Sequence, residues 1–485
     1  MATLATDTAV HGRDTAPRRQ RAWWVALAVG FSATLGFASA VEPRAAVLLV
    51  GAVIAPVLAW AEPRFALALL CIVLGINLDV ITAPVHVSLP QLASLVLIAS
   101  VALRRMANAD PRYAEEDAAS QRHSTRSRVW VAAGLIVIVA SLPSLARAPS
   151  ADASAGALLQ LLEVALVLTA AVRAVASRRD SVDALFALLA AGALISLVPA
   201  VAQVVLDIGP ATYRLGGVMR AYSTYGQPNT YGQYLVGVLP LAAALAARSR
   251  SVHWTAAAVA IGAGIVLTGS RGAWIAAATG LLVFYVVVAR PRPGVIAAGL
   301  IGLGLACALI AFTPDTFVAG RLDLSDWSTQ QRLLLLLSAW DGIVRSPILG
   351  HGPGSFGDLL PAVARHGLTD DITMPHNLLL HVWFEMGLLA IVVLLALLTA
   401  YYVTAVRAFR ATRDLRIAAL IAATTAMLTS AMFGSLLIRG IQELFVLLVA
   451  MTAALVAGGA RPPRRRTRFA GAHCAEAAVD RECPP

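Results

Sequence analysis

Long apolar runs dominate this chain and limit what it can fold into. They lie near 23–41, 45–61, 65–80, 88–103, 129–145, 155–173, 182–206, 229–247, 253–269, 272–289, 294–313, 379–403, 417–437 and 441–458. Each is long enough, or nearly so, to cross roughly 30 Å of hydrocarbon. Apolar residues make up 59% of the 485 residues and charged residues 13%, too few polar side chains to coat a soluble globule. We therefore predict an all-α, polytopic transmembrane helical bundle with about 12–14 spans, the lower number applying if two short early runs form a re-entrant pair.

The basic charge of the chain lies in arginines that cluster between the apolar runs. The formal net charge is +11, and no lysine occurs. If the chain starts in the cytoplasm and the runs alternate across the membrane, the arginine-rich links fall on the cytoplasmic side, as the positive-inside rule requires. These links are 104–128, 174–181, 248–252, 290–293 and 406–416. The arginines thus indicate membrane topology, and we expect the lipid bilayer as a partner and no nucleic acid.

The apolar runs and the polar ends divide the chain into four parts. We expect a disordered cytoplasmic N-terminus at 1–22, N-terminal transmembrane helices at 23–206, a second transmembrane region at 207–459, and a basic cytoplasmic tail at 460–485. The second region includes one large extracytoplasmic loop at 314–377, and loops of that length are more often functional than idle. The four cysteines indicate neither a disulfide framework nor a zinc site.

Arg271 lies in a tight turn between two apolar runs, at the outer end of a predicted helical hairpin. A charge at that depth is costly unless it is paired or solvated, and no carboxylate is adjacent in the sequence, so an anionic ligand is indicated. The alternative is an arginine whose head group reaches the outer lipid head groups. An arginine on the outer face runs against the positive-inside tendency, which favours the functional interpretation.

The outer loop carries a second arginine and a glycine-rich turn. Arg332 lies on a predicted amphipathic helix, too far from Asp341 for an ion pair between adjacent turns, and it is either an anion ligand or a solvated loop residue. The turn at 347–356 includes Gly352 and Gly354, whose backbone amides could approach a phosphate closely. The turn lacks the terminal Lys-Ser/Thr of a P-loop, so a purely structural turn is the main alternative.

Several polar residues gather at the start of the run 379–403. Asn377, His381 and Glu385 are spaced four apart and share one helix face, which we expect to point into the bundle and not toward lipid. His376 lies at the mouth of this helix, where a neutral imidazole could act as a general base near pH 7. A structural histidine is one alternative. A zinc site is another, although the i, i+5 spacing of the two histidines is poor for shared ligation.

The outer connector at 207–228 adds candidates for substrate binding. Arg214 and Arg220 lie within it, and Asn229 follows at the entrance of the next helix. Two arginines with the neighbouring tyrosines would suit a phosphorylated sugar. Interfacial tyrosines are, however, also ordinary members of an aromatic belt.

Taken together, these motifs resemble the O-antigen ligase and polymerase-related superfamily of bacterial membrane glycosyltransferases. The resemblance covers roughly residues 182–440, and it depends on the order, spacing and shared outer-face placement of motifs that are each weak alone. The motifs are 214–217 with Pro228 and Asn229, 268–272, Arg332 with Trp340, 347–356, 375–377 and 385–389.

The resemblance implies transfer of a glycan from an undecaprenyl-diphosphate carrier to an acceptor hydroxyl on the outer face of the bacterial cytoplasmic (inner) membrane. It implies no cofactor, neither a metal nor a nucleotide sugar. In family terms Arg271 and Arg332 hold the diphosphate, and His376 lies beside the acceptor, which is an unidentified glycan, lipid or protein. The further candidates for substrate contacts are Arg214, Arg220, Asn229, Gly352, Gly354, Asn377 and Glu385.

Two other functions fit parts of the pattern. A polymerase that joins polysaccharide repeat units would use the same donor chemistry with another lipid-linked chain as acceptor. A membrane transporter or flippase would be equally hydrophobic, but transporters usually place ionisable residues or broken helices near the bilayer midplane. The polar motifs of this sequence lie instead at the outer mouth of the bundle, so we expect a transferase.

Overall fold

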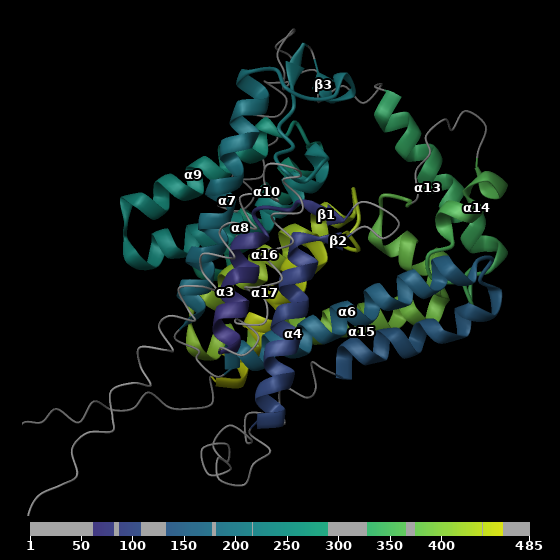
Figure 1. Ribbon diagram of the computed structural model, residues 1–485, viewed down its shortest axis with the longest axis horizontal. Helices are drawn as coiled ribbons and strands as arrows, with labels where there is room; N and C mark the ends of the chain where they lie inside the picture. The colour runs from purple at the N-terminus through teal and green to yellow at the C-terminus, as the bar shows by residue number, and fades with distance from the viewer. Residues whose placement is uncertain are drawn as a thin grey trace, which may run out of the picture.

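A computed structural model describes residues 62–81, 87–107, 132–176, 181–215, 217–289, 327–364, 374–438 and 440–458. Most of these residues lie in helices, and the strands form two small antiparallel hairpins (Figure 1). The expected all-α, polytopic membrane fold is thereby confirmed. The expected spans at 23–41, 45–61 and 294–313 lie outside the described residues, as do 314–326 and 365–373 of the expected outer loop.

The helices follow the apolar runs closely. In the first half of the described chain they are α3 (Pro63–Val73), α4 (Leu89–Ala107), the helix Ala132–Arg147 with its final 3-10 segment η2 (Leu142–Arg147), α6 (Ala151–Ala176) and α7 (Val182–Val205). In the second half they are α8 (Pro228–Ser249), α9 (Val252–Leu267), α10 (Arg271–Ala289), α13 (Trp327–Arg345), α14 (Phe356–Val363), α15 (Leu378–Thr412), α16 (Leu415–Ala431) and α17 (Ile441–Gly458).

The two hairpins close connectors between helices. Strands β1 (Asp79–Ile81) and β2 (Val87–Ser88) pair between α3 and α4. Strands β3 (Arg214–Leu215) and β4 (Val218–Met219) pair between α7 and α8, after the short 3-10 helix η4 (Ala211–Tyr213).

Length and composition separate the helices into two groups. Five of those that the structure describes are long and apolar enough to cross a membrane, namely α6, α7, α8, α10 and α15. The others in the transmembrane region have shorter apolar helical stretches of 10–17 residues: α3, Leu89–Arg104 of α4, Ala132–Arg147, α9, α16 and Ile441–Ala457 of α17. Several of the apolar runs were expected to be short, and the helices that they form, such as α3, are short as well.

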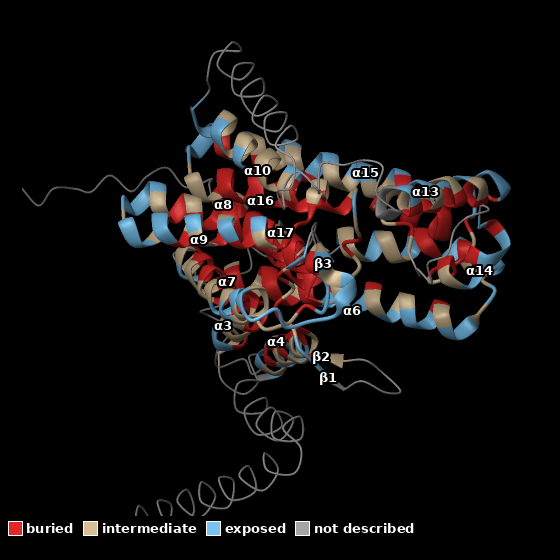
Figure 2. Cartoon of the chain, turned by 90° about the horizontal axis from the view of Figure 1, so that it is seen from above, coloured by how far each residue is buried: buried red, intermediate tan, exposed pale blue. Residues whose placement is uncertain are grey.

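Helix α8 lies at the centre of the bundle. Of the residues in its most apolar window, 83% are buried, compared with 22% in α10, and α8 packs against α7, α9, α10, α16 and α17. Small residues permit this close packing. Gly237, for example, leaves no room for a Cβ, which would lie 2.9 Å from atoms of both Leu444 and Met427. Viewed from above, buried residues concentrate along α8, α16 and α17, whereas α9 is largely exposed (Figure 2).

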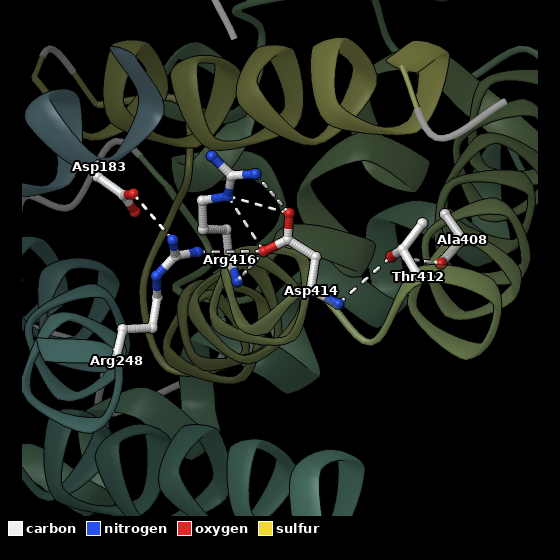
Figure 3. Close-up of polar contacts among 6 residues, drawn as sticks. All are labelled: Asp183, Arg248, Ala408, Thr412, Asp414 and Arg416. Carbon is white, nitrogen blue, oxygen red and sulfur yellow. Dashed lines mark hydrogen bonds and ion pairs between the residues drawn. The ribbon is translucent and has the colours of Figure 1, made fainter. Parts of the chain in front are cut away.

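One set of helix ends is joined by charged side chains (Figure 3). Arg248, at the end of α8, lies 3.1 Å from Asp183 at the start of α7 and 3.4 Å from Asp414, which precedes α16. Asp414 caps α16 through the backbone N–H of Arg416 and pairs with the Arg416 side chain at 2.7 Å. Alternation of the apolar runs predicts that all three ends lie on the same side of the membrane, and the structure brings them together.

The opposite helix ends meet in a second set of contacts. Tyr225, in the connector before α8, donates its hydroxyl to the carbonyl of Leu74 after α3. Gln203, near the end of α7, accepts from the backbone N–H of Ser223 at 2.7 Å. Ser154, near the start of α6, donates to the carbonyl of Pro353 at 2.9 Å. These are the ends that alternation assigns to the outer side.

The described part of the expected outer loop is folded. Helices α13 and α14 pack on the first part of α15 around a small core of their own, and in Figure 1 they lie at one side of the bundle. That core includes Leu335, Ile343, Phe356 and Phe384. Gly342 lies so close to the Phe384 ring that a Cβ would be 2.2 Å from it. The predicted amphipathic helix around Arg332 is therefore α13, and it is anchored to α15.

Candidate active site

His376 and Asn377 form the entrance to α15. The side-chain oxygen of Asn377 accepts from the backbone N–H groups of Leu379 and Leu380, both at 3.1 Å, and so caps the helix. Its amide nitrogen donates to the carbonyl of Met432 at 3.4 Å. His376 adopts a positive φ of 49°, which is uncommon for a residue other than glycine and is held here by the capped helix that follows. The hydrogen bonds of Asn377 thus fix the backbone from which the side chain of His376 extends.

The surroundings of His376 keep its imidazole neutral at pH 7. Its pKa is lowered from 6.5 to about 4, first by burial, then by the charge of Arg332, and then by His381. Arg332 lies on α13, 44 positions earlier in the chain than His376. Its charge nevertheless acts on His376, because α13 packs on the first part of α15. Two of the three predicted catalytic residues, Arg332 and His376, therefore influence each other electrostatically.

Arg271 is the first residue of α10, immediately after a turn in which Gly269 has a φ of +58°. The next residue, Gly272, packs against Phe433, whose Cβ would lie 2.8 Å from a Cβ added at Gly272. Phe433 follows Met432, the residue that Asn377 holds by hydrogen bonding. One turn after α16 therefore links the start of α10, which carries Arg271, with the start of α15, which follows His376.

Arg220 and Asn229 lie against the same α9–α10 turn. The guanidinium of Arg220 donates to the carbonyl of Thr268 at 2.8 Å and to the side-chain oxygen of Asn229 at 3.0 Å. The backbone N–H of Ala221 donates to the carbonyl of Leu267 at 2.9 Å. The connector before α8 is thus held against the turn that carries Arg271, and two of the expected substrate contacts bond to each other there.

Arg214 occupies a different place. It lies on β3, is exposed, and forms a two-point contact with Asp207, with a distance of 3.1 Å between its Nε and the carboxylate. This ion pair between residues only seven positions apart was not predicted from the sequence. The contact stiffens the outer rim of the connector, and the structure does not bring Arg214 into the group formed by Arg220, Asn229 and Arg271.

The glycine-rich turn docks on α15, where that helix is interrupted. Gly350, Gly352 and Gly354 all have positive φ angles, of 74°, 99° and 76°, which explains their alternate spacing. The amide of Gly352 donates to the backbone carbonyl of Glu385 at 2.8 Å. Gly387 has a φ of 77° and breaks the helix at this point. The backbone of the turn is therefore in direct contact with the backbone of α15 at the point where that helix is broken.

The side chain of Glu385 also faces this turn. Its carboxylate accepts from the backbone N–H of Gly354 at 2.8 Å and of Phe356 at 3.2 Å. His381, one turn earlier on α15, lies 3.3 Å from the same carboxylate. Glu385 is only 3% exposed and His381 9%. Asn377, His381 and Glu385 do share a helix face as predicted, and that face points into the protein.

A buried polar cluster that the sequence analysis did not single out lies between α4, α6 and α17. Gln91 donates to the carboxylate of Glu163 at 3.1 Å, and Gln160 donates to the side chain of Gln442 at 2.7 Å. Gln442 in turn donates to Glu443 at 3.2 Å. A carboxylate or amide within an apolar run is the sequence signal that could have revealed these residues. Glu163 lies about 18 Å along α6 from the start of that helix. The polar motifs singled out in the sequence were instead expected at the outer mouth of the bundle.

An apolar cavity of about 200 Å³ lies beside α15. It is enclosed by α6, α15, α17 and the helix Ala132–Arg147. On α15 its lining runs from Leu378, two residues after His376, to Tyr401. The cavity therefore begins at the first residue of α15 and continues along that helix into the apolar part of the bundle.

The geometry combines cationic and neutral polar groups at one end of the bundle. Guanidinium groups suit a diphosphate because they present several donors in a fixed plane and keep their charge. A neutral imidazole beside them can accept a hydrogen bond from a hydroxyl. In the described ranges no three His, Cys, Asp or Glu side chains come together in an arrangement that could hold a metal ion.

Comparison with known proteins agrees with the motifs. The family model described as O-antigen ligase matches residues 256–395, a stretch that contains Arg271, Arg332 and His376. No curated protein sequence shows a significant match to the chain. Residues 256–395 are therefore similar to the O-antigen ligase family, which confirms the resemblance to the O-antigen ligase and polymerase-related superfamily that the motifs indicated.

Proposed function

We propose that this protein is a ligase-type glycosyltransferase that moves a glycan from undecaprenyl diphosphate to an acceptor hydroxyl at the outer face of the bacterial cytoplasmic membrane. The observation that carries the proposal is the burial of His376 at the entrance to α15, where the charge of Arg332 on α13 further lowers its pKa. A histidine kept neutral by burial lies within reach of an arginine charge, at the end of the bundle where the α9–α10 turn presents Arg271. The family match to 256–395 supports the same class of reaction.

In this mechanism Arg271 and Arg332 bind the diphosphate of the donor. Negative charge develops on the oxygen that leaves the anomeric carbon, and a guanidinium already in place stabilises that charge. Arg220 and Asn229 brace the turn that carries Arg271 and lie close enough to add contacts to the donor. Arg214, at the exposed rim, is suited to the glycan portion.

His376 accepts the proton of the attacking hydroxyl. The acceptor oxygen forms a bond to the anomeric carbon, the bond from that carbon to the diphosphate oxygen breaks, and the diphosphate leaves with the electron pair. A histidine with a pKa of about 4 is a weak base for a free hydroxyl, but the hydroxyl becomes strongly acidic as the new bond forms. The bound diphosphate also raises the pKa of His376, because its charge opposes that of Arg332. A single displacement of this kind inverts the anomeric carbon.

The lipid part of the donor needs an apolar path from the site. The cavity beside α15 begins at Leu378 and continues along the helix to Tyr401. Its lining consists almost entirely of apolar side chains, which suits a polyprenyl chain entering from the membrane. The cavity supports a lipid-linked donor and not a water-soluble nucleotide sugar.

The positive-inside rule supports an outward-facing site. The helix ends joined by Asp183, Arg248 and Asp414 are also the ends with exposed arginines, such as Arg410 and Arg413. Arginine-rich ends face the cytoplasm in most membrane proteins. His376 is at the opposite ends of the helices, so we assign it to the extracytoplasmic side of the cytoplasmic membrane.

Two alternatives remain in view. A polysaccharide polymerase would use the same donor chemistry and differ in its acceptor. A transporter or flippase is favoured by one observation, the buried polar cluster around Glu163 and Glu443. The family match and the neutral histidine beside an arginine favour a transferase over a transporter.

The purified protein tests the proposal in a transfer assay with a lipid-linked glycan donor and the envelope lipids or proteins of the host as acceptors. We expect Arg271→Ala, Arg332→Ala and His376→Ala each to reduce the rate by about a hundredfold or more. Arg271→Lys is expected to be poorly tolerated, because a lysine cannot reproduce the two-point contact with a phosphate. Arg250→Ala, an exposed arginine at the opposite helix ends, serves as the matched arginine control and is expected to keep the wild-type rate. Wild-type rates in the first three variants would contradict the assigned site.

A further inference from the structure

The turn between α13 and α14 is tied to α15 by more than backbone contacts. His351 and Gly352 donate their backbone N–H groups to carbonyls of α15, and the N–H of Leu388 donates back to the carbonyl of Ile348 at 3.0 Å. Cβ atoms could not be added at this contact, since one at Gly387 would lie 2.2 Å from the carbonyl oxygen of Ile348. These bonds fix the turn at the place where α15 is broken.

The carboxylate of Glu385 fills the concave side of the turn. Both of its oxygens accept backbone N–H groups, Oε2 from Gly354 and Oε1 from Phe356, and Oε1 also lies 3.3 Å from Nε2 of His381. Phe356 is the first residue of α14, where the helix dipole favours an anion. An internal carboxylate therefore accepts the Gly354 amide that a phosphate would need in a glycine-rich cradle, and the backbone carbonyl of Glu385 accepts the Gly352 amide.

The hydrogen bonds between Glu385 and the α13–α14 turn, called the tie below, connect the two helices that carry the candidate active site. Helix α13 carries Arg332, and α15 follows directly after His376. The described contacts between this segment and α15 also include apolar packing around Phe384 and the edge-to-face pair of Trp340 with Trp383, whose ring centroids are 5.8 Å apart. The indole N–H of Trp383 donates to the carbonyl of Pro347 at 2.9 Å. Apolar packing is not directional, whereas the carboxylate bonds fix orientation.

We propose that Glu385 is a positioning residue whose carboxylate holds the α13–α14 segment against the start of α15 and so places Arg332 beside His376. Glu385 then has no contact with the substrate. The inference deepens the proposed function, because it takes Arg332 and His376 as the groups that act on the donor and acceptor. The tie itself is a property of the protein without substrate and can be tested without turnover.

Hydrogen exchange of the full-length protein in lipid nanodiscs tests the tie directly. The variants are Glu385→Gln, which keeps the side-chain shape, and Glu385→Ala. The matched control is Asp358→Asn, which removes an exposed carboxylate from the first turn of α14. We expect the amides of Gly354 and Phe356 to exchange roughly tenfold faster or more in both Glu385 variants and to be unchanged in the control. Unchanged protection in Glu385→Ala would overturn the proposal.

The titration of His376 tests the consequence, and a residue that merely stabilised the fold would not change it. The charges that act on His376 come from Arg332 of α13 and His381 of α15. If Glu385→Gln releases α13, Arg332 moves away and the pKa of His376 rises from about 4 toward 6.5, and it rises further than in His381→Gln, which removes only the charge of His381. NMR with labelled histidine, assigned with His376→Gln, measures both shifts. A variant with lost activity but an unchanged His376 titration would show that Glu385 acts on substrate, which contradicts the proposal. If the wild type transfers no glycan at all, the proposed function fails, while exchange and titration still decide the role of Glu385.

Discussion

At neutral pH the imidazole of His376 carries no charge, because burial and the nearby Arg332 both oppose its protonation. The sequence predicted roles for Arg271, Arg332 and His376 from their residue types and from their places in an outer turn, on an amphipathic outer helix and at a helix mouth. It could not predict that Arg332 acts on His376, because the two residues are far apart in the chain and meet only through the packing of α13 on α15. It also could not identify the partners of Glu385, since those partners are backbone N–H groups that every sequence contains.

The acid limb of the pH profile reports on this coupling. A histidine with a lowered pKa stays in its active neutral form as the pH falls, and loses that form only when the pH passes through about 4. We therefore expect kcat/KM to be flat from pH 7 to about pH 5 and to fall near pH 4. Arg332→Gln should move this limb upward, whereas Arg332→Lys, which keeps the charge, should leave it in place even though the rate falls. An acid limb near 6.5 in the wild type would contradict the account.

At the scale of the elements, apolar runs predicted the existence of the described helices but not all of their ends. The run 379–403 ends where arginines begin, yet α15 continues to Thr412, because a helix can extend beyond the hydrocarbon into water. The run 417–437 is longer than α16, which ends at Ala431 before the turn that contacts Gly272 and Asn377. The fold of α13 and α14 was predicted only in part, since their core depends on contacts with α15 that are distant in sequence.

The break in α15 is required for the docking of the glycine-rich turn. Gly387→Ala places a Cβ in a left-handed conformation and within 2.2 Å of the carbonyl oxygen of Ile348. We expect it to destabilise the protein by roughly 1–3 kcal/mol, seen as a lower thermal unfolding midpoint in detergent. Gly262→Ala, in the middle of α9 with nothing within 4 Å of the added Cβ, is the matched control and should be neutral or slightly stabilising. Equal midpoints for the two variants would show that the break is not needed.

The charged cluster at the other helix ends contributes modestly to stability. Arg248 is 35% exposed, so each of its two ion pairs should contribute no more than about 0.2–1 kcal/mol. Arg248→Gln is therefore expected to lower the unfolding free energy by a small amount that shrinks further in high salt. Arg250→Gln, a neighbouring exposed arginine for which the described residues show no ion pair, is the control. A loss of several kcal/mol, or a loss independent of salt, would contradict this assignment.

Asp414 makes the same cluster sensitive to acid. Burial raises the pKa of Asp414, but the hydrogen bonds from Arg416 and the charges of Arg416 and Arg248 outweigh burial and lower it below 3.8. The carboxylate therefore stabilises the folded state above about pH 4, and this contribution disappears as the pH falls through the lowered value. Unfolding midpoints of the wild type and Asp414→Asn should differ at pH 7 and converge as the pH falls through the lowered pKa of Asp414. A constant difference over that range would exclude the linkage.

For the whole molecule, alternation of apolar runs with arginine-rich links predicted which helix ends lie together. The structure agrees in every contact set described above, from Arg248 with Asp183 and Asp414 at one end to Asn377 with Met432 at the other. Alternation works because each span reverses direction, so parity alone assigns the ends. Tilts, neighbours and the buried cluster around Glu163 depend on side-chain packing, which the apolar pattern does not encode.

Labelling of introduced cysteines checks the orientation in the membrane. Val218→Cys, on the outer hairpin, and Arg250→Cys, after α8, are placed in a chain from which the native cysteines have been removed. We expect a membrane-impermeant thiol reagent applied to cells with a permeable outer barrier to label the first variant and not the second. Labelling of the second should require disruption of the cytoplasmic membrane. The reverse pattern would place His376 in the cytoplasm.

The central claim, that His376 and its arginines transfer a lipid-linked glycan, is tested most directly by glycan profiling of a deletion strain complemented with wild type or with His376→Ala. The account predicts that wild type restores long glycan on its lipid or protein acceptor. It predicts that His376→Ala leaves this glycan missing and the lipid-linked polymer accumulated, although the variant protein is present in the membrane at a normal level. Single repeat units in place of polymer would assign the same site to a polymerase. An unchanged glycan profile in the deletion strain, or full restoration by His376→Ala, would contradict the account.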